Sequence, residues 1–277
     1  MNKNSLPLVS IVIATFNRAP LLKETLQSVI SQTYKNLEII VVGDGCTDNT
    51  EEVVANLNDT RIHYFEITHA GRPAVPRNFG AMKAKGNYIA FCDDDDIWVN
   101  TKIEKQLAVF LCNPELGLVY TGFSNFTKNT DFSEVVNLDK TSFEKQLYRN
   151  RIAFSTIMIS KKILHKIQGF DERAALKASE DYLFVLKIVA CYPFFFLNEP
   201  LLKYRVHAEG ISSTKNSVWK LFKYYIRLLI CFFECYKLRY LSFSKLIFMG
   251  LYHFKHVSKM ILFTYFQSFK NIWCLKR

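Results

Sequence analysis

The sequence lacks any cysteine pattern typical of a metal centre or a disulfide framework. Its seven cysteines are an odd number, with no CxxC pair and no alternation with histidine. A structural zinc site and a disulfide scaffold are therefore not expected. This cysteine usage fits a protein of the reducing cytosol.

The sequence also lacks a long uncharged apolar run. No such run approaches the roughly 20 residues that a membrane-spanning helix needs. The stretch "LPLVSIVIATF" after Lys3 is short and has no A-x-A-like cleavage site. We therefore interpret it as a buried first strand rather than a signal peptide. The 277 residues, 49% hydrophobic and 22% charged, indicate one large or two small globular domains.

Acidic residues are almost absent from the last part of the chain. Residues 216–277 hold 11 Lys and Arg against one acid, Glu234, and 17 of the 41 aromatic residues. Because the whole chain carries +11 and this part carries +10, residues 1–215 carry only +1. This shift in composition predicts a domain boundary near Lys215, between a domain over 1–215 and a basic, aromatic tail over 216–277.

Strand and helix patterns alternate in the first half of the chain. The continuous β-branched run over 8–15 is typical of a strand buried on both faces. Further strands are predicted over 37–42, 61–67 and 87–92. Helices are predicted over 21–32, 50–57, 79–86 and 101–111, with a Gly/Pro-rich loop over 69–78. This order predicts an α/β fold with a mostly parallel sheet flanked by helices.

The stretch "CDDDDIW" places four consecutive aspartates at the end of the predicted fourth strand. Each like-charged pair costs roughly 4 kcal/mol at ~4 Å and an effective dielectric of ~20. Mg²⁺ or Mn²⁺ is the simplest partner for such hard oxygen ligands. An EF-hand is excluded because Val99 and Lys105 stand where its glycine and glutamate belong. A solvated acidic turn that caps the next helix is the alternative.

Two other polar loops should meet this acidic turn. "TFNR" (15–18) and "GDGCTDNT" (43–50) also follow predicted parallel strands. In open α/β sheets, ligands bind beyond the carboxyl ends of the strands. We therefore expect a ligand site where these three loops converge.

Four stretches carry a resemblance to a known family. They are "VSIVIATFNR", "LEIIVVGDGCTDNT", "RNFGAMKAKGNYIAFCDDDDIW" and "ASEDYLFVLKI", in the family's order between residue 8 and about residue 210. The chain resembles a family 2 glycosyltransferase of the GT-A fold, of the type that builds bacterial capsule, O-antigen and exopolysaccharide. The resemblance implies inverting, metal-dependent transfer of a sugar from a nucleotide-sugar donor to a lipid-linked or saccharide acceptor. UDP is the default nucleotide, with GDP and dTDP open.

The resemblance also implies the residues of the donor site. Asp95 is the expected direct ligand of Mg²⁺ or Mn²⁺, with Asp93 beside it, and His207 is either a further ligand or a surface histidine. Asp44 is expected to contact the base, although Gly43 replaces an acid that the family usually has. The other expected nucleotide-sugar contacts are Thr15, Asn17, Arg18, Arg77, Asp93 and Asp94. For Arg77, a salt bridge within the domain is the alternative.

The acceptor side is expected at a helix that begins near residue 180. In the resemblance, Asp181 aligns with the catalytic base and Glu180 marks the acceptor side. The alternative is a helix capped by Ser179 with two first-turn acids, which the helix dipole favours. Trp98 either walls the sugar pocket or packs in the core, and we favour the core.

The basic tail is predicted to be amphipathic. If residues 217–238 are helical, a charged stripe covers about a 100° arc; it consists of Lys220, Lys223, Arg227, Glu234 and Lys237. This pattern favours a monotopic membrane segment facing anionic lipid. The protein would then be cytoplasmic and peripheral on the inner face of the cytoplasmic membrane. Packing on the catalytic domain or a partner subunit is the alternative. Nucleic-acid binding is not expected because no such module is recognisable.

Two rival functions remain at this stage. One is a non-catalytic carbohydrate-binding or scaffold protein on the same fold, against which the intact Asp95 and Asp181 argue. The other is a nucleotidyltransferase that makes the sugar nucleotide. That class usually begins with a Gly-rich phosphate loop, whereas this chain has "ATFNR".

Overall fold

The computed structural model describes residues 6–127, 135–137, 140–206 and 218–274. These residues include two compact units. The first comprises residues up to Gln146 and the stretch from Asn150 to His207. The second comprises Leu147–Arg149 and the chain from residue 208 onward.

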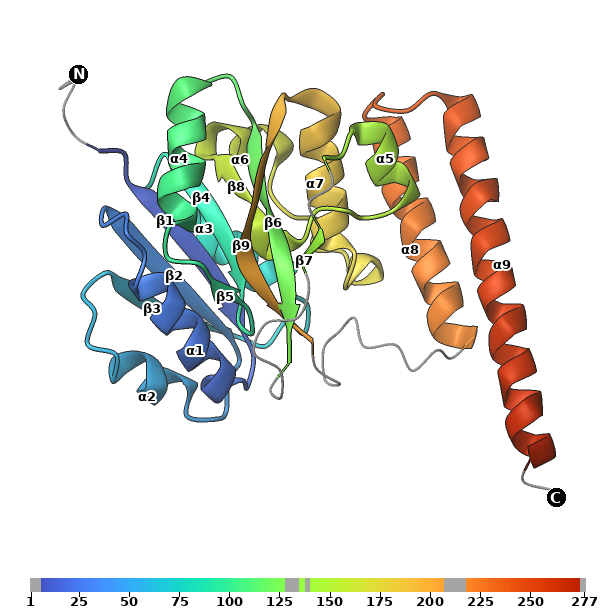
Figure 1. Cartoon of the computed structure of the whole chain (residues 1–277), viewed down its shortest axis with the longest axis horizontal. Coiled ribbons are helices and arrows are strands. Elements are labelled where there is room, and N and C mark those ends of the chain that lie inside the picture. The colour runs from blue at the N-terminus through green and yellow to red at the C-terminus, as the bar shows by residue number, and fades with distance from the viewer. Residues whose placement is uncertain (1–5, 128–134, 138–139, 207–217, 275–277) are drawn as a thin grey trace. The chain divides into compact units, whose positions relative to one another are not determined.

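A mixed sheet forms the centre of the first unit (Figure 1). Its strand order is β3-β2-β1-β4-β8-β6-β9-β5, with β7 paired to β6. The strands are β1 (Val9–Thr15), β2 (Leu37–Asp44), β3 (Ile62–Ile67), β4 (Tyr88–Asp93), β5 (Ile97–Trp98), β6 (Leu118–Phe126), β7 (Val135–Asn137), β8 (Met158–Ser160) and β9 (Phe194–Arg205). The parallel order β3-β2-β1-β4 confirms the predicted α/β arrangement. Beyond β4, the strand β8 runs antiparallel between β4 and β6.

Helices cover both faces of this sheet. The helices of the first half are α1 (Ala19–Ile30), α2 (Thr50–Ala55), α3 (Ala74–Lys83) and α4 (Lys102–Cys112). They are followed by α5 (Phe143–Tyr148), α6 (Lys161–Ile167) and α7 (Glu180–Cys191), with short 3₁₀ turns at Phe154–Thr156 and Ala174–Leu176. Alternate strand residues point to opposite faces. Thus Ile11 and Ile13 join a core cluster with residues of α1 and α4, while Val12 joins a second cluster.

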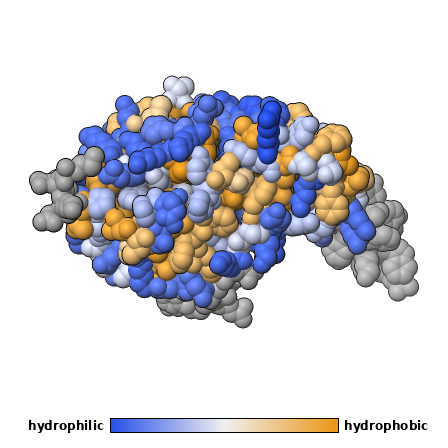
Figure 2. Space-filling view, turned by 90° about the horizontal axis from the view of Figure 1, so that it is seen from above, coloured by the Kyte–Doolittle hydropathy of each residue, from blue (hydrophilic) through white to orange (hydrophobic). Residues whose placement is uncertain are grey.

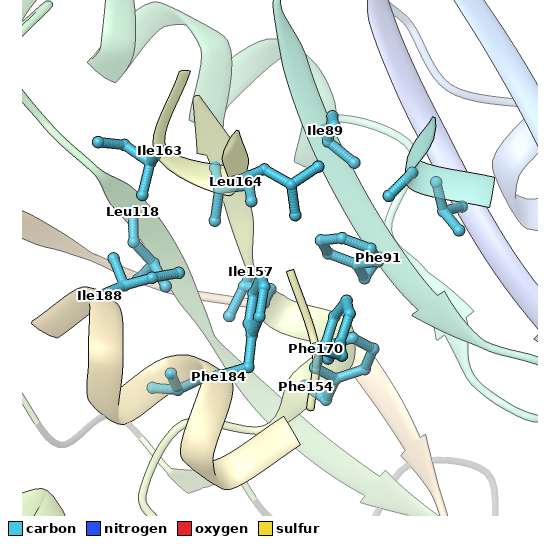
Figure 3. Close-up of a cluster of buried hydrophobic side chains, with 14 of the residues drawn as sticks. Ile89, Phe91, Leu118, Phe154, Ile157, Ile163, Leu164, Phe170, Phe184 and Ile188 are labelled. Atoms are coloured by element: carbon cyan, nitrogen blue, oxygen red, sulfur yellow. The ribbon is translucent and has the colours of Figure 1, made fainter. Parts of the chain in front are cut away.

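The second cluster lies between the sheet, α6 and α7 (Figure 3). Figure 3 shows its aromatic centre, where Phe91 of β4 meets Phe154, Phe170 and Phe184. The rings of Phe170 and Phe184 stack with centroids 4.0 Å apart. Offset and edge-to-face aromatic packing of this kind adds stabilisation beyond the buried area. The cluster therefore fixes the start of α7 against the end of β4.

The prediction of a helix over 79–86 was wrong at both ends. The helix begins at Ala74 and ends at Lys83. Pro76 falls in its first turn, where a proline lacks only an N–H that would have no helical partner. Gly86 instead lies against β1, with its N–H donated to the Ser10 hydroxyl at 2.9 Å. An added Cβ at Gly86 would lie 2.6 Å from the Leu8 carbonyl oxygen, so only glycine fits there.

The described part of the second unit contains two long helices. They are α8 (Val218–Lys237) and α9 (Phe243–Cys274), which pack against each other. The Tyr225 hydroxyl of α8 donates to the Gly250 carbonyl of α9 at 3.2 Å. None of the helices that the structure describes has an apolar stretch long enough to cross a membrane.

Candidate active site

The polar loops that follow β1 and β4 meet as predicted. Thr15 ends β1, and Ala14 pairs with Asp93 at the end of β4. The Thr15 hydroxyl donates to Asp94 Oδ2 at 2.7 Å. The loop after β2 joins them through Asn17, whose Oδ1 accepts the Thr47 N–H at 2.7 Å. Asn17 has a φ of 52°, a left-handed conformation that asparagine tolerates better than most residues.

Two arginines bind the side chains of the acidic turn. Arg18 Nη1 lies 3.1 Å from Asp94 Oδ1 and 3.0 Å from Asp95 Oδ2. Arg77 Nη2 lies 2.7 Å from Asp93 Oδ1. The pKa of Asp94 is nevertheless raised to about 6, because burial outweighs the attraction of Arg18.

The fourth aspartate of the turn is the most enclosed. Asp96 is 1% exposed, and its Oδ1 accepts the backbone N–H of Arg205 at 3.1 Å. Its Oδ2 is buried and has no hydrogen-bond partner among the described residues. Burial, and then the charges of Asp93 and Asp95, raise the pKa of Asp96 well above its usual value.

Arg77 connects the acidic turn to α7. Its guanidinium is buried, with Nη1 3.0 Å from Glu180 Oε1 and the ring of Phe154 centred 4.1 Å away. The internal salt bridge that the sequence left open for Arg77 is therefore present on both sides. One cation thus holds the end of β4 and the beginning of α7 in a single site.

The start of α7 presents two neighbouring carboxylates. Glu180 is buried and paired with Arg77, and its Oε2 also accepts the Ser179 N–H at 3.0 Å. Asp181 Oδ1 accepts the backbone N–H of Tyr182 at 2.8 Å. Burial, followed by the charge of Glu180, raises the pKa of Asp181 to about 6. A carboxylate of this pKa is ionised at neutral pH and is still basic enough to accept a proton in a transition state.

Asp44, the expected base contact, ends β2 with a buried carboxylate. Its Oδ1 and Oδ2 accept the backbone N–H groups of Ala70 and Gly71 at 2.7 and 3.0 Å. Asp44 therefore holds the loop between β3 and α3. The sequence analysis missed Glu66, which accepts the N–H groups of Gly45 and Cys46 at 2.7 and 2.9 Å.

Glu66 also explains the glycine at position 43. A Cβ added to Gly43 would collide with the Glu66 carboxylate, which Tyr64 binds through its hydroxyl. The Glu66 carboxylate of β3 therefore occupies the space that a side chain at position 43 would enter.

The remaining expected residues are placed as follows. Trp98 is 3% exposed and belongs to a core cluster, which confirms the core interpretation. Its indole N–H donates to the Ser155 carbonyl at 3.0 Å. His207 lies outside the described residues.

The donor set of the site suits a hard divalent cation. Six carboxyl groups gather among the described residues, and two guanidinium groups pair with their side chains; the acids are Asp93, Asp94, Asp95, Asp96, Glu180 and Asp181. No group of three or more His, Cys, Asp or Glu side chains in the described residues is arranged to hold a metal alone. Mg²⁺ commonly uses only one or two carboxylates together with substrate phosphates, so the residues present fit such an ion.

Comparisons with solved structures identify the fold. The chain is similar to residues 1–349 of Staphylococcus aureus TarS in a complex with UDP-GlcNAc, with a TM-score of 0.65 and 21% identity over 81% of this chain and 66% of that one. It is also similar to the mannosyltransferase PcManGT of Pyrobaculum calidifontis in complex with GDP-Man and Mn²⁺ (TM-score 0.62, 21% identity, 84% of this chain and 65% of that one). This likeness confirms the GT-A fold.

Curated relatives are closer in sequence. The chain is 34% identical over 210 residues to the Escherichia coli UDP-Glc:alpha-D-GlcNAc-diphosphoundecaprenol beta-1,3-glucosyltransferase WfaP, covering 75% of this chain and 81% of the relative. It is 30% identical over 218 residues to the putative teichuronic acid biosynthesis glycosyltransferase TuaG of Bacillus subtilis, covering 77% and 84%. It spans only 30% of an uncharacterised Rickettsia bellii glycosyltransferase, at 32% identity over 73% of this chain.

The family model described as glycosyl transferase family 2 matches residues 10–179. This match runs from β1 to the residue before α7, and so includes the acidic turn and Arg77. The chain therefore belongs to glycosyl transferase family 2.

Proposed function

We propose that this protein is an inverting glycosyltransferase of bacterial surface polysaccharide synthesis. It would move a sugar from a nucleotide sugar, with a UDP-sugar as the first choice, to a hydroxyl of a lipid-linked or saccharide acceptor. The observation that carries the proposal is the buried Arg77, which joins Asp93 of the acidic turn to Glu180 beside Asp181. In this proposal, the donor-binding edge of the sheet and the base Asp181 belong to one site.

The relatives support this choice of substrates. The name of the Escherichia coli relative gives UDP-Glc as donor and a diphosphoundecaprenol-linked sugar as acceptor. The Bacillus subtilis relative is named for teichuronic acid biosynthesis. One structural neighbour was solved with UDP-GlcNAc and another with GDP-Man and Mn²⁺. A panel of UDP-, GDP- and dTDP-sugars with a diphosphate-lipid acceptor therefore tests the function directly.

The donor would bind at the carboxyl ends of β1, β2 and β4. Asp95 and Asp93 would hold Mg²⁺ or Mn²⁺, which when bound supplies positive charge to the departing nucleoside diphosphate. Thr15 and Arg18 position Asp94 beside them, and Asn17 holds the loop after β2. Asp44 would contact the base, and it also holds the loop between β3 and α3.

The acceptor hydroxyl would approach from the α7 side. Asp181 takes the hydroxyl proton as the acceptor oxygen forms its bond to the anomeric carbon. The bond between that carbon and the diphosphate oxygen breaks on the opposite face, so the configuration inverts. Glu180, paired with Arg77, orients the start of α7 rather than acting as the base.

Family membership weighs against the two rivals. A non-catalytic scaffold would have no need of Asp181 with a pKa near 6 beside the donor site. Production of a sugar nucleotide from a sugar phosphate and UTP would instead identify a nucleotidyltransferase. Incubation with each substrate pair separates these activities.

Association of the tail with an anionic membrane is part of the proposal. Along α8, Trp219, Phe222, Ile226 and Phe233 are exposed and fall within about a 60° arc. The opposite face of α8 is buried, through Leu221, Leu228, Cys231, Phe232 and Cys235. The tail thus has a buried face, with α8 packed against α9, and an exposed apolar stripe beside its basic residues. Figure 2 shows apolar residues (orange) at the surface of α8 and α9, toward the right of the view.

The buried acids predict that stability depends on pH and on metal. Asp94 and Asp181 have folded pKa values of about 6, above the unfolded value of about 3.9. The native state then holds protons that the unfolded state has lost, so the free energy of unfolding falls as the pH rises from about 4 to above 6. For Asp94 the loss is on the order of 3 kcal/mol. Thermal unfolding should show a lower midpoint at pH 7.5 than at pH 5.

Mn²⁺ should counteract this loss. With UDP present, Mn²⁺ should raise the unfolding midpoint more at pH 7.5, where the acids are ionised, than at pH 5. In the absence of metal, the unfolding midpoint of Asp94→Asn should depend less on pH than that of the wild type. Equal Mn²⁺ shifts at both pH values would contradict a carboxylate site.

Asp95→Asn should abolish Mn²⁺-dependent donor binding without unfolding the protein. The substitution removes one negative charge from a crowded turn, so its unfolding midpoint without metal should be equal to or above that of the wild type. Calorimetric titration of UDP with Mn²⁺ measures the loss. Asp59→Asn, which breaks an ion pair with Arg61 outside the site, is the matched control and should bind normally. Full Mn²⁺-dependent turnover by Asp95→Asn would exclude Asp95 as the ligand.

Asp181→Asn should retain donor binding and lose transfer. We expect turnover to fall by at least ~100-fold, the lower range for removal of a general base. In the wild type, turnover should fall as the pH drops below about 6, where Asp181 becomes protonated. Asp171→Asn removes a partly buried acid that pairs with the exposed Arg173, and it serves as the control. Transfer within a few-fold of wild type would leave Asp181 as a helix-terminal acid only.

The exposed stripe of α8 should be needed for membrane binding. Replacing Trp219, Phe222 and Phe233 by serine should release the full-length protein from vesicles that contain anionic lipid, measured by cosedimentation. High salt should partly release the wild type, because each basic residue near the surface contributes ~1 kcal/mol. Serine at the exposed Met82 and Leu111 of the first unit is the control. If the wild type ignores anionic vesicles, the stripe serves a protein partner instead.

A further inference from the structure

Arg205 contacts the acidic turn from the end of β9 and takes no part in the proposed binding of the donor or acceptor. It is the last residue of β9, and its side chain is 4% exposed. Its Nε donates to the backbone carbonyl of Asp95 at 2.8 Å, and its own backbone N–H donates to Asp96 Oδ1 at 3.1 Å. Its Nη2 lies 2.5 Å from Glu24 Oε2 of α1. One residue therefore ties the acidic turn to both β9 and α1.

Arg205 differs from Arg18 and Arg77 in what it binds. Those two arginines pair with carboxylate oxygens of the turn, which a ligand can compete for. Arg205 instead binds the main chain of Asp95. The direction of a side chain follows from the position of its backbone. A fixed peptide at Asp95 therefore limits the directions in which its carboxylate can point.

The turn needs such a restraint from outside. Asp93–Asp96 joins β4 to β5, which has only two residues, Ile97 and Trp98, paired with Leu202 and Lys203 of β9. Four adjacent carboxylates repel one another and favour an opened turn. The guanidinium of Arg205 also lies 4.5 Å from the ring centre of Phe126, so its own position is fixed by packing.

We propose that Arg205, held by Glu24, is a positioning residue that keeps Asp95 in the orientation that binds a divalent cation and the nucleotide diphosphate. This inference rests on the proposed function, since it concerns the same site. Arg205 touches no substrate and acts only through the main chain of Asp95. Glu24 supports it from α1: the salt bridge fixes the far end of the guanidinium while Nε stays on the carbonyl.

The alternative is that Arg205 only stabilises the fold. A residue of that kind lowers the unfolding midpoint and leaves metal binding by the folded protein unchanged. Arg61 provides a matched comparison because its Nη2 also binds a backbone carbonyl, that of Ile30 at 3.0 Å, and an aspartate, Asp59. Arg61 lies away from the acidic turn.

The experiment compares full-length Arg205→Met, Arg205→Lys, Glu24→Gln and Arg61→Met with the wild type. Binding of Mn²⁺ is measured by the loss of the free-ion electron paramagnetic resonance signal. One series contains UDP, and a parallel series contains GDP. The unfolding midpoint of each variant is measured without metal. Activity is not needed for either reading.

The binding readings should separate the variants. Arg205→Met should weaken Mn²⁺ binding in the presence of the nucleotide by about tenfold or more, as expected for loss of a charged hydrogen bond. Arg205→Lys should restore part of it, because an ammonium can reach the carbonyl or Glu24 but lacks the fork that serves both. Glu24→Gln should weaken binding by about threefold. Arg61→Met should lower the midpoint and bind Mn²⁺ like the wild type.

Three results would overturn the inference. Arg205→Met that binds Mn²⁺ within twofold of wild type shows that Arg205 is a packing residue. If that variant does not fold, Glu24→Gln provides the test. A folded Glu24→Gln protein that binds Mn²⁺ as tightly as the wild type contradicts the inference. A wild-type chain that binds no Mn²⁺ with either nucleotide overturns the proposed function as well, which distinguishes the two failures.

Discussion

The repulsion among four adjacent carboxylates is the constraint on which the arrangement of this site depends. Three arginines from separate parts of the chain contact the turn: two pair with its carboxylates, and Arg205 binds its main chain. Arg18 comes from the loop after β1, Arg77 from α3 and Arg205 from the end of β9. Because each arginine also belongs to another element, neutralising the turn fixes those elements relative to it. The same arginine contacts therefore both offset the negative charge of the turn and hold the elements of the site together.

The positions of these arginines follow from the order of the sheet. Parallel pairing of β1 with β4 brings Thr15 beside Asp94, although 79 residues separate them. The α3 crossover between β3 and β4 carries Arg77 back to the same edge. Strand β9 reaches the turn from the other side through its pairing with β5. The sheet thus gathers cations that are scattered in the sequence around one anionic turn.

This difference between local and distant information explains what could be predicted from the sequence. The β-branched runs and the helix patterns predicted β1 to β4, because buried strands and amphipathic helices are encoded locally. The start of α3 was missed because Pro73 and Pro76 look like loop residues. In the structure, the helix begins directly after Pro73 and has Pro76 in its first turn. Motifs predicted the acidic turn and the pair at 180–181.

The partners of those motifs could not be predicted, because they are set by contacts between remote strands. Glu66 lies against Gly43 only because β3 pairs with β2, and no local pattern in the sequence marks this contact. The same holds for Glu24 with Arg205, which are 181 residues apart.

The buried Arg77 connects the charge of Asp93 to that of Glu180. Its guanidinium is shared between Asp93, which belongs to the proposed donor side, and Glu180, which belongs to the proposed acceptor side. Any change in charge at Asp93, such as the approach of a cation, alters the pull on Arg77 and hence on Glu180. Glu180 in turn is the second cause, after burial, of the raised pKa of Asp181. In the proposed enzyme, a cation that binds with the donor at one end of this chain of charges would therefore influence the basicity of Asp181 at the other.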